Sequence, residues 1–405
     1  MSASDKHFEA FADHTLLKHA ILSAYLQRWA FKILQWGRAV SSVYFVDGFA
    51  GSGRDRQGNP GSPVIACRIA QQVRAHFAKK NTQGRLGVFA VEADPAKYDL
   101  LLDVIAPFEA VDPGCIHALS GSAAAWMDDI TRVTGMQPTL FFLDPFGLKG
   151  LDAATYPSML AGPQNEVLAL FHDVGAARLR GVVHAGARLE QELSALAETP
   201  TFFPEMDEQM AESLRAKEAR RLSIVRKMTP AAKEAVSRAL GDATWEIDLR
   251  DLPPDRARSE LIFRFVKKLA EAGARHFHVL PMRGETGGHK YCLVHATKSP
   301  AGYIAMKEAV SESLNRSELS EIMRERMRVD LGVPLSEVDT FLQDRFGGTT
   351  LRWTSQKGQG SSVRSLLLVE TSVFPFQCQE IREHLRSNGW LRRVGRRDEC
   401  EIPAG

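Results

Sequence analysis

The stretch DGFAGSG at residues 47–53 has the residue types of a ligand-binding loop. Asp47 ends an apolar run, and glycines follow at positions 48, 51 and 53. Because glycine has no Cβ, backbone N–H groups can approach a carboxylate or phosphate there, and positive φ angles cost little. Two interpretations stay open: a loop that holds a nucleotide-like cofactor, and a tight strand-to-helix turn with no ligand.

The order of residues in this loop favours one cofactor. The pattern D-x-F-A-G-x-G begins with an acid and is closer to the S-adenosylmethionine loop of amino-group methyltransferases than to the GxGxxG loop of dinucleotide enzymes. In this interpretation Asp47 orients the amino end of the cofactor, and the loop backbone meets its methionine portion. The predicted cofactor-binding residues of the loop are Asp47, Gly48, Phe49, Ala50, Gly51 and Gly53.

Two further strand ends bear on the cofactor. Glu92 ends the next apolar run, where an acid would accept hydrogen bonds from both ribose hydroxyls, and Asp94 is a substitute candidate. The alternative is an exposed acid at a strand end. After the third run the chain has Ser120-Gly121-Ser122 in place of the acid that often receives an adenine amino group. We therefore predict only a hydroxyl, that of Ser122, for this role.

The stretch LFFLDPFGLKG supplies candidates for a reaction. Asp144-Pro145-Phe146 resembles the [DN]PP[YF] motif of enzymes that methylate exocyclic amines, in which the acid or amide and a backbone carbonyl accept the amine hydrogens and an aromatic ring stacks on the base. Phe146 comes one position early, and Gly147 stands at the usual aromatic position. In the alternative, Asp144 caps the next turn and Phe146 packs in the core. Lys149 adds a cation suited to phosphate.

The charged extension RDRQGNPGSP follows the glycine loop. Arg54 and Arg56 flank a second turn, and Ser62-Pro63 is expected to be the N-cap and first residue of a helix. Free N–H groups at a helix N-terminus favour anions. The extension therefore predicts contact with a phosphate or a nucleic-acid backbone, the alternative being solvated surface arginines.

Short apolar runs alternate with amphipathic stretches, which is typical of a parallel sheet covered by helices on both faces. A Gly-rich turn between two later runs predicts a terminal antiparallel hairpin. We predict an α/β fold: a Rossmann-like (class I methyltransferase-type), mostly parallel sheet ending in that hairpin, with simpler doubly wound folds as the alternative. The runs are 43–47, 86–92, 115–121, 139–145, 166–173, 276–282 and 290–298, and the intervening helices are 63–78, 95–106, 122–134 and 255–273.

The remaining segments differ from this core in their pattern of apolar and charged residues. The charged region 176–244 has no strand pattern and is expected to be a helical insertion. The segment 301–405 is expected to be a small α+β module. There a strand over 365–371, a helix and two strands suggest a winged helix. The predicted division is N-terminal helices at 1–38, a core at 39–175 and 245–300, the insertion, and the C-terminal module.

Composition sets outer limits on function. The net charge of +2 and 25% charged residues are those of an ordinary globular protein and by themselves do not favour nucleic acid. The five cysteines include no CxxC pair, so we predict no metal site and no disulfide framework. The N-terminus is charged, and no run approaches the roughly 18 apolar residues of a spanning helix. The expected location is the cytoplasm, without membrane association.

Taken together, four segments resemble the three-Cys-motif partner (TcmP) family of bacteria and their mobile elements. They are LLKHAILSAYLQRW, DGFAGSGRDRQGNPGSPVIA, LFFLDPFGLKG and KYCLVHATKSPAGYIAMKEA. The resemblance implies a Rossmann methyltransferase-like core and a separate partner protein with a three-cysteine, radical-S-adenosylmethionine-like motif. Lys18 and His19 match the family's Lys-His pair. They reach the pocket if the N-terminal helix folds over the carboxyl edge of the sheet; otherwise His19 lies on the helix surface. Ser122 departs from the family's Gly-Asp.

Three functions are compatible with these features. The first is an S-adenosylmethionine-dependent methyltransferase-like protein that acts on nucleic acid together with the three-cysteine partner. The second is a non-catalytic subunit that recognises nucleic acid for that partner. The third is a metal-dependent nuclease in which Asp47, Glu92 and Asp144 converge. C-terminal arginines would contact phosphate, although nearby acids almost cancel their charge: Arg382, Arg386, Arg392, Arg393, Arg396 and Arg397.

Overall fold

The computed structural model describes residues 13–36, 40–55, 57–180, 230–231, 233–284, 288–316, 319–354, 362–394 and 397–403. Its main sheet has the strand order β3-β2-β1-β4-β5-β7-β6. The first five strands are parallel, and β7 runs antiparallel to both β5 and β6. The predicted fold class is therefore confirmed. The strands are β1 (Ser42–Asp47), β2 (Arg85–Glu92), β3 (Ile116–Ser120), β4 (Thr139–Leu143), β5 (Glu166–Phe171), β6 (His276–Arg283) and β7 (His289–Thr297).

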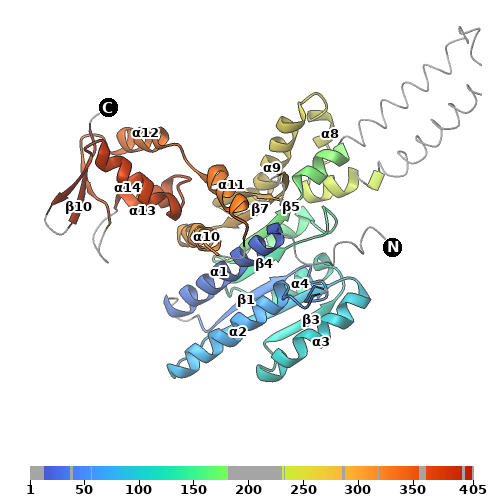
Figure 1. Cartoon of the computed structure of the whole chain (residues 1–405). Helices are drawn as coiled ribbons and strands as arrows, with labels where there is room; N and C mark the ends of the chain where they lie inside the picture. Colours follow the sequence, from blue (N-terminus) through green and yellow to red (C-terminus); the bar gives the residue numbers. More distant parts are fainter. Residues whose placement is uncertain are drawn as a thin grey trace, which may run out of the picture.

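Helices cover both faces of this sheet (Figure 1). Every residue of β4 and β5 is buried, as expected for strands that face a helix layer on each side. One layer holds α1 (Asp13–Trp36), α2 (Ser62–Lys79), α3 (Pro95–Val111), α10 (Pro300–Ser313) and α11 (Glu321–Leu331). The other holds α4 (Ala123–Thr134), η2 (Ala153–Thr155), α5 (Tyr156–Met159), α8 (Trp245–Asp248), α9 (Pro254–Glu271) and helical residues 173–180 and 233–240.

Helix α1 contributes side chains to the hydrophobic core on one face of the main sheet. Leu17, Ile21 and Tyr25 are fully buried, because they repeat at helical spacing on the side that faces the sheet and α10. Arg28 forms an ion pair with Glu308 of α10, at 3.5 Å. The N-terminal helix is thus fixed between the sheet and a helix that comes some 280 residues later.

The C-terminal module has a sheet of its own (Figure 1). Its strand order is β8-β10-β9. The strand predicted over 365–371 is wrong, because residues 365–370 belong to a helix, α13. Ser362 caps that helix by accepting the N–H of Ser365 at 3.2 Å. The winged helix stays a prediction. The elements are α12 (Leu335–Phe346), β8 (Thr350–Arg352), α13 (Val363–Glu370), η3 (Pro375–Gln377), α14 (Cys378–Ser387), β9 (Leu391–Val394) and β10 (Arg397–Glu401).

The cores divide the chain differently from the predicted boundary at residue 301. Buried side chains of α10 and α11, among them Met306 and Met327, join the core of the main sheet. A separate cluster begins at Val338 and includes Leu367 and Ile381. Within the insertion predicted at 176–244, residues 181–229 lie outside the described residues. In the part of the chain that the structure describes, no helix has the length and apolar character needed to cross a bilayer.

Candidate functional site

The candidate residues meet at one edge of the main sheet. Parallel strands β1, β2, β4 and β5 all end there, and the antiparallel β7 begins there, since Phe171 pairs with Cys292. In open α/β sheets, ligands bind outside the carboxyl ends of the strands. The carboxyl edge of this sheet is therefore the candidate ligand-binding edge.

Two glycines give the loop after β1 its shape. Gly51 has φ +61° and Gly53 has φ +76°, both in the left-handed region that favours glycine. A Cβ on Gly53 would lie 3.1 Å from the Val104 side chain, so α3 packs directly against the loop. A Cβ on Gly51 would meet no described atom within 4 Å. The loop therefore has open space beside Gly51.

Glu92 is fixed beside this open space. One carboxylate oxygen accepts the N–H of Gly51 at 2.8 Å, and the other accepts the N–H of Asp94, also at 2.8 Å. The side chain of Asp94 caps α3 by accepting the N–H groups of Ala96 and Lys97 through one carboxylate oxygen, and its role as the substitute ribose ligand stays a prediction. A carboxylate oxygen has two lone pairs, so each oxygen of Glu92 can accept a further hydrogen bond.

Asp47 lies deeper, at the end of β1, and is fully buried. One oxygen accepts the N–H of Phe49 at 3.1 Å, and the other has no hydrogen-bond partner among the described residues. Burial raises its pKa from 3.8 to about 7, although the Ser62 hydroxyl and the Phe49 N–H oppose this shift. The carboxyl group of Asp47 thus titrates near neutral pH.

Asp144, at the end of β4, forms an ion pair with Lys18 of α1. Only 8% of the Lys18 side chain and 21% of the Asp144 side chain are exposed. Helix α1 therefore does extend over the carboxyl edge of the sheet, and it brings Lys18 to Asp144. Phe146 is 75% exposed, which contradicts the interpretation that its ring packs in the core.

Aromatic and imidazole side chains that the sequence did not single out lie next to Asp144. The rings of His172 and Tyr291 are 5.3 Å apart, and the ring of His14 is 5.7 Å from that of Tyr291. Burial lowers the pKa of His172, while the Asp144 carboxylate opposes this shift. His172 directly follows β5, so its place after an apolar run was the available signal.

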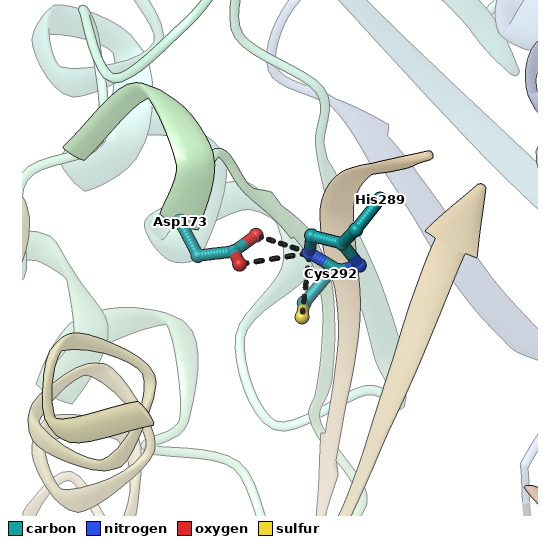
Figure 2. Close-up of side chains that lie close together, drawn as sticks. All are labelled: Asp173, His289 and Cys292. Atoms are coloured by element: carbon teal, nitrogen blue, oxygen red, sulfur yellow. Dashed lines mark hydrogen bonds and ion pairs between the residues drawn. The ribbon is translucent and has the colours of Figure 1, made fainter. Parts of the chain in front are cut away.

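A second group on the same edge consists of Asp173, His289 and Cys292 (Figure 2). Nε2 of His289 lies 2.7 and 2.9 Å from the two Asp173 oxygens and 3.8 Å from Sγ of Cys292. Arg258 contacts Asp173 at 3.1 Å. Burial raises the pKa of the Cys292 thiol. Among the described residues, this is the cluster with convergent metal-ligand atoms.

The acids of the predicted nuclease site do not form such a cluster. Asp47 is buried, Glu92 binds backbone N–H groups, and Asp144 is paired with Lys18. Each carboxylate is therefore engaged or enclosed separately, which argues against a metal held jointly by the three.

The charged extension folds back on itself. The carboxylate of Asp55 accepts the N–H of Asn59 at 2.7 Å, and the guanidinium of Arg54 donates to the carbonyl of Gly58 at 2.8 Å. Arg56 lies outside the described residues. Arg54 therefore supports the turn in this structure, and its predicted contact with phosphate stays a prediction.

Serine is the N-cap of helix α4 but not of helix α2. The N-cap of α2 is Gly61, one residue before the predicted Ser62, and Pro63 occupies the second position of the helix. Ser122 is the N-cap of α4, where its hydroxyl accepts the N–H of Ala125 at 3.2 Å. The side chain predicted to meet adenine therefore already has a structural role.

His19 and Lys149 lie apart from the Asp144 pair. His19 lines a groove of about 350 Å³ between α1 and α2, together with Pro60 and Arg68. Lys149 is exposed beyond the end of β4. Of the predicted Lys-His pair, Lys18 reaches the sheet edge, while its neighbour faces the groove.

The C-terminal arginines are partly neutralised. Arg382 and Arg386 both contact the carboxylate of Asp398, at 3.0 and 3.1 Å. Arg392 and Arg393 are exposed on β9. Arg392 also lies 3.9 Å from Glu401, so three of the predicted phosphate contacts have acidic partners within the module.

No family model matches the chain, and no curated protein matches it. Solved structures with a partial likeness include an O-methyltransferase from Bacillus cereus in complex with SAH, at 12% identity over 69% of this chain and 80% of that chain, with a TM-score of 0.34. A candidate O-methyltransferase from Klebsiella pneumoniae has 10% identity over 70% and 90% of the two chains, with a TM-score of 0.30. At these values the fold is established by strand order and direction, not by the likeness.

Proposed function

We propose that this chain is an S-adenosylmethionine-dependent, methyltransferase-like protein that acts on nucleic acid together with a three-cysteine, radical-type partner protein. The observation that carries the cofactor proposal is the position of Glu92. Its carboxylate is held by the N–H groups of Gly51 and Asp94 at the end of β2, beside open space at the glycine loop. The partner is proposed from the family resemblance alone.

The residues present fit this cofactor. Glu92 retains lone pairs that can accept hydrogen bonds from two ribose hydroxyls. The absence of a side chain at Gly51 leaves room for a ligand to approach the loop backbone. When bound, the cofactor supplies an electrophilic methyl group.

Asp144 and Phe146 would then hold the acceptor. The carboxylate of Asp144 can accept a hydrogen bond from an exocyclic amine, once Lys18 has moved away. The exposed ring of Phe146 offers a surface on which a base can stack. Transfer to nitrogen depends mainly on orienting the amine, so a strong general base is dispensable.

A specific observation favours the second candidate, a non-catalytic recognition subunit. The ammonium group of Lys18 is bound to the carboxylate that the amine would need. If this ion pair persists when nucleic acid binds, Asp144 has a structural role and the chain presents its ligand to the partner.

Support for nucleic acid comes from the C-terminal module and Phe146. The module has the order helix, strand, helix, helix, hairpin, which is the order of a winged helix. Arg392 and Arg393 are exposed on its hairpin and suited to phosphate.

Calorimetric titration with S-adenosylmethionine and its demethylated product tests the cofactor. In Glu92→Gln one carboxylate oxygen is replaced by an NH₂ donor, which cannot accept a hydrogen bond from the backbone N–H that it faces, and the negative charge is lost, so the Kd should rise at least about tenfold. Glu109→Gln, on the exposed side of α3, should bind like the wild type. Absence of binding by the wild type at millimolar ligand would refute the cofactor proposal.

Transfer of a labelled methyl group to RNA and DNA, with the partner present, separates the two candidates. Asparagine retains an acceptor oxygen, so Asp144→Asn should keep activity, whereas Asp144→Ala should lose it and still bind cofactor. Cofactor binding without transfer to either nucleic acid would favour the recognition subunit.

A further inference from the structure

We propose that Asp173, His289 and Cys292 form a binding site for a divalent metal ion of the zinc class, with one coordination position open. The ligand atoms are a carboxylate oxygen of Asp173, Nε2 of His289 and Sγ of Cys292, and all lie within 4.8 Å of one another. This site goes beyond the proposed function and does not depend on it, because none of its residues belongs to the cofactor loop.

The donor set matches the preferences of zinc. Zinc binds thiolate, imidazole and carboxylate groups in tetrahedral geometry, and sites with three protein ligands keep a fourth position for water or substrate. At typical metal–ligand distances the ligand atoms of a tetrahedral site lie about 3.4 to 3.6 Å apart. Here Nε2 is 3.8 Å from Sγ and 2.7 Å from the nearer carboxylate oxygen. Side-chain adjustments of at most about 1.3 Å, the largest being that of the oxygen–Sγ pair, which lies within 4.8 Å, would therefore admit the ion.

A β-bulge in the hairpin explains why the two β7 ligands lie on the same side. On a regular strand, residues three apart point to opposite faces. Met282 pairs with Tyr291 whereas Arg283 pairs with His289, so Lys290 is an extra residue in β7. The extra residue shifts the alternation by one, and His289 and Cys292 converge on Asp173 (Figure 2).

The surroundings favour a bound ion. Asp173 is fully buried, Cys292 is buried, and 11% of the His289 side chain is exposed. Arg258 holds Asp173 from outside the cluster, as hydrogen-bonding partners of ligating carboxylates do. A thiolate and a carboxylate would carry two negative charges, which a divalent ion balances without the cost of burying them uncompensated.

The same geometry argues against a Cys-His-Asp catalytic triad. In a triad, the acid and the nucleophile contact different nitrogens of the imidazole. Here Asp173 and Cys292 both contact Nε2 of His289. Three ligand atoms that converge on one point, as these do, are the arrangement of a metal centre.

The test is titration of the chelator-treated, full-length protein with Co²⁺, followed by absorption spectroscopy. One ion should bind per chain and give a thiolate-to-cobalt charge-transfer band together with the visible bands of a tetrahedral site. Cys292→Ser should abolish the charge-transfer band. Cys115→Ser, at another buried thiol beside an acid, should retain it.

X-ray absorption of the Zn²⁺-loaded wild type gives an answer that does not require a variant to fold. One sulfur and a remainder of nitrogen and oxygen ligands per zinc are expected. Failure of the wild type to bind Co²⁺ or Zn²⁺, a zinc spectrum without sulfur, or an unchanged charge-transfer band in folded Cys292→Ser would overturn the proposal.

Discussion

Replacing Asp47 with asparagine should stabilise the protein increasingly as the pH rises from 5 to 8. In the native state the pKa of Asp47 is raised from 3.8 to about 7 by burial. Between pH 3.8 and about pH 7, the carboxyl group of Asp47 keeps its proton in the native state and has released it in the unfolded chain. Stability therefore falls as pH rises through this window. The asparagine side chain does not titrate, so the variant does not lose this stability as the pH rises.

The size of the effect follows from the two pKa values. One pH unit within the window corresponds to about 1.4 kcal/mol, and the native group has titrated by about pH 8. The variant should thus gain about 3 kcal/mol over the wild type between pH 5 and pH 8. Because Asp47 is fully buried, solvent screening does little to reduce this figure.

Urea unfolding of both proteins at the two pH values measures this gain. Only the difference between variant and wild type is used, since other groups titrate in both proteins. Asp99→Asn, at an exposed position of α3, is the matched control and should follow the wild type. If the difference for Asp47→Asn did not change with pH, or changed in the opposite direction, the carboxyl group would not be protonated in the native state.

Two further substitutions test packing and charge in the same region. Lys18→Met leaves the largely buried Asp144 carboxylate without its cation and should lower the free energy of unfolding by about 2 kcal/mol. The double variant Lys18→Met/Asp144→Asn should recover much of this loss, because the buried charge is then removed as well. Equal losses in the single and double variants would mean that the two residues are not coupled. Gly53→Ala should cost about 2 to 4 kcal/mol, because it adds a contact with α3 to the backbone strain. Gly114→Ala has the strain alone and should cost about 1 to 2 kcal/mol, and urea unfolding that ranked the two glycine variants in the opposite order would contradict the packing described for the loop.

The main sheet could be predicted because its strands are short apolar runs separated by helical patterns. All seven strands fall within the predicted runs to within a few residues. The prediction of a strand over the C-terminal run 365–371 is wrong, because four consecutive apolar residues suit a buried helix as well as a strand. In the structure, the cap at Ser362 and the burial of Val363 and Leu367 against the module core favour the helix.

The site was only partly predictable, because its contacts depend on distant segments. The residues at strand ends could be located from sequence, but the ion pair of Asp144 joins it to a lysine 126 positions away. Asp173 and His289 are 116 positions apart, and the bulge that brings Cys292 to the same side leaves no recognisable spacing. Such convergence is set by the sheet topology, not by local pattern.

The packing of α1 against α10 has a consequence for synthesis of the protein. Residues about 280 positions apart must both have left the ribosome before this contact can form. At about 5 to 20 residues per second, the apolar face of α1 waits roughly 15 to 60 s for its partner. During that interval the side of α1 that packs on α10 lacks this partner, and transiently exposed apolar surface of this kind favours aggregation. We therefore expect the yield of folded protein to depend on the rate at which the chain is elongated, although that rate does not change the contacts of the folded state.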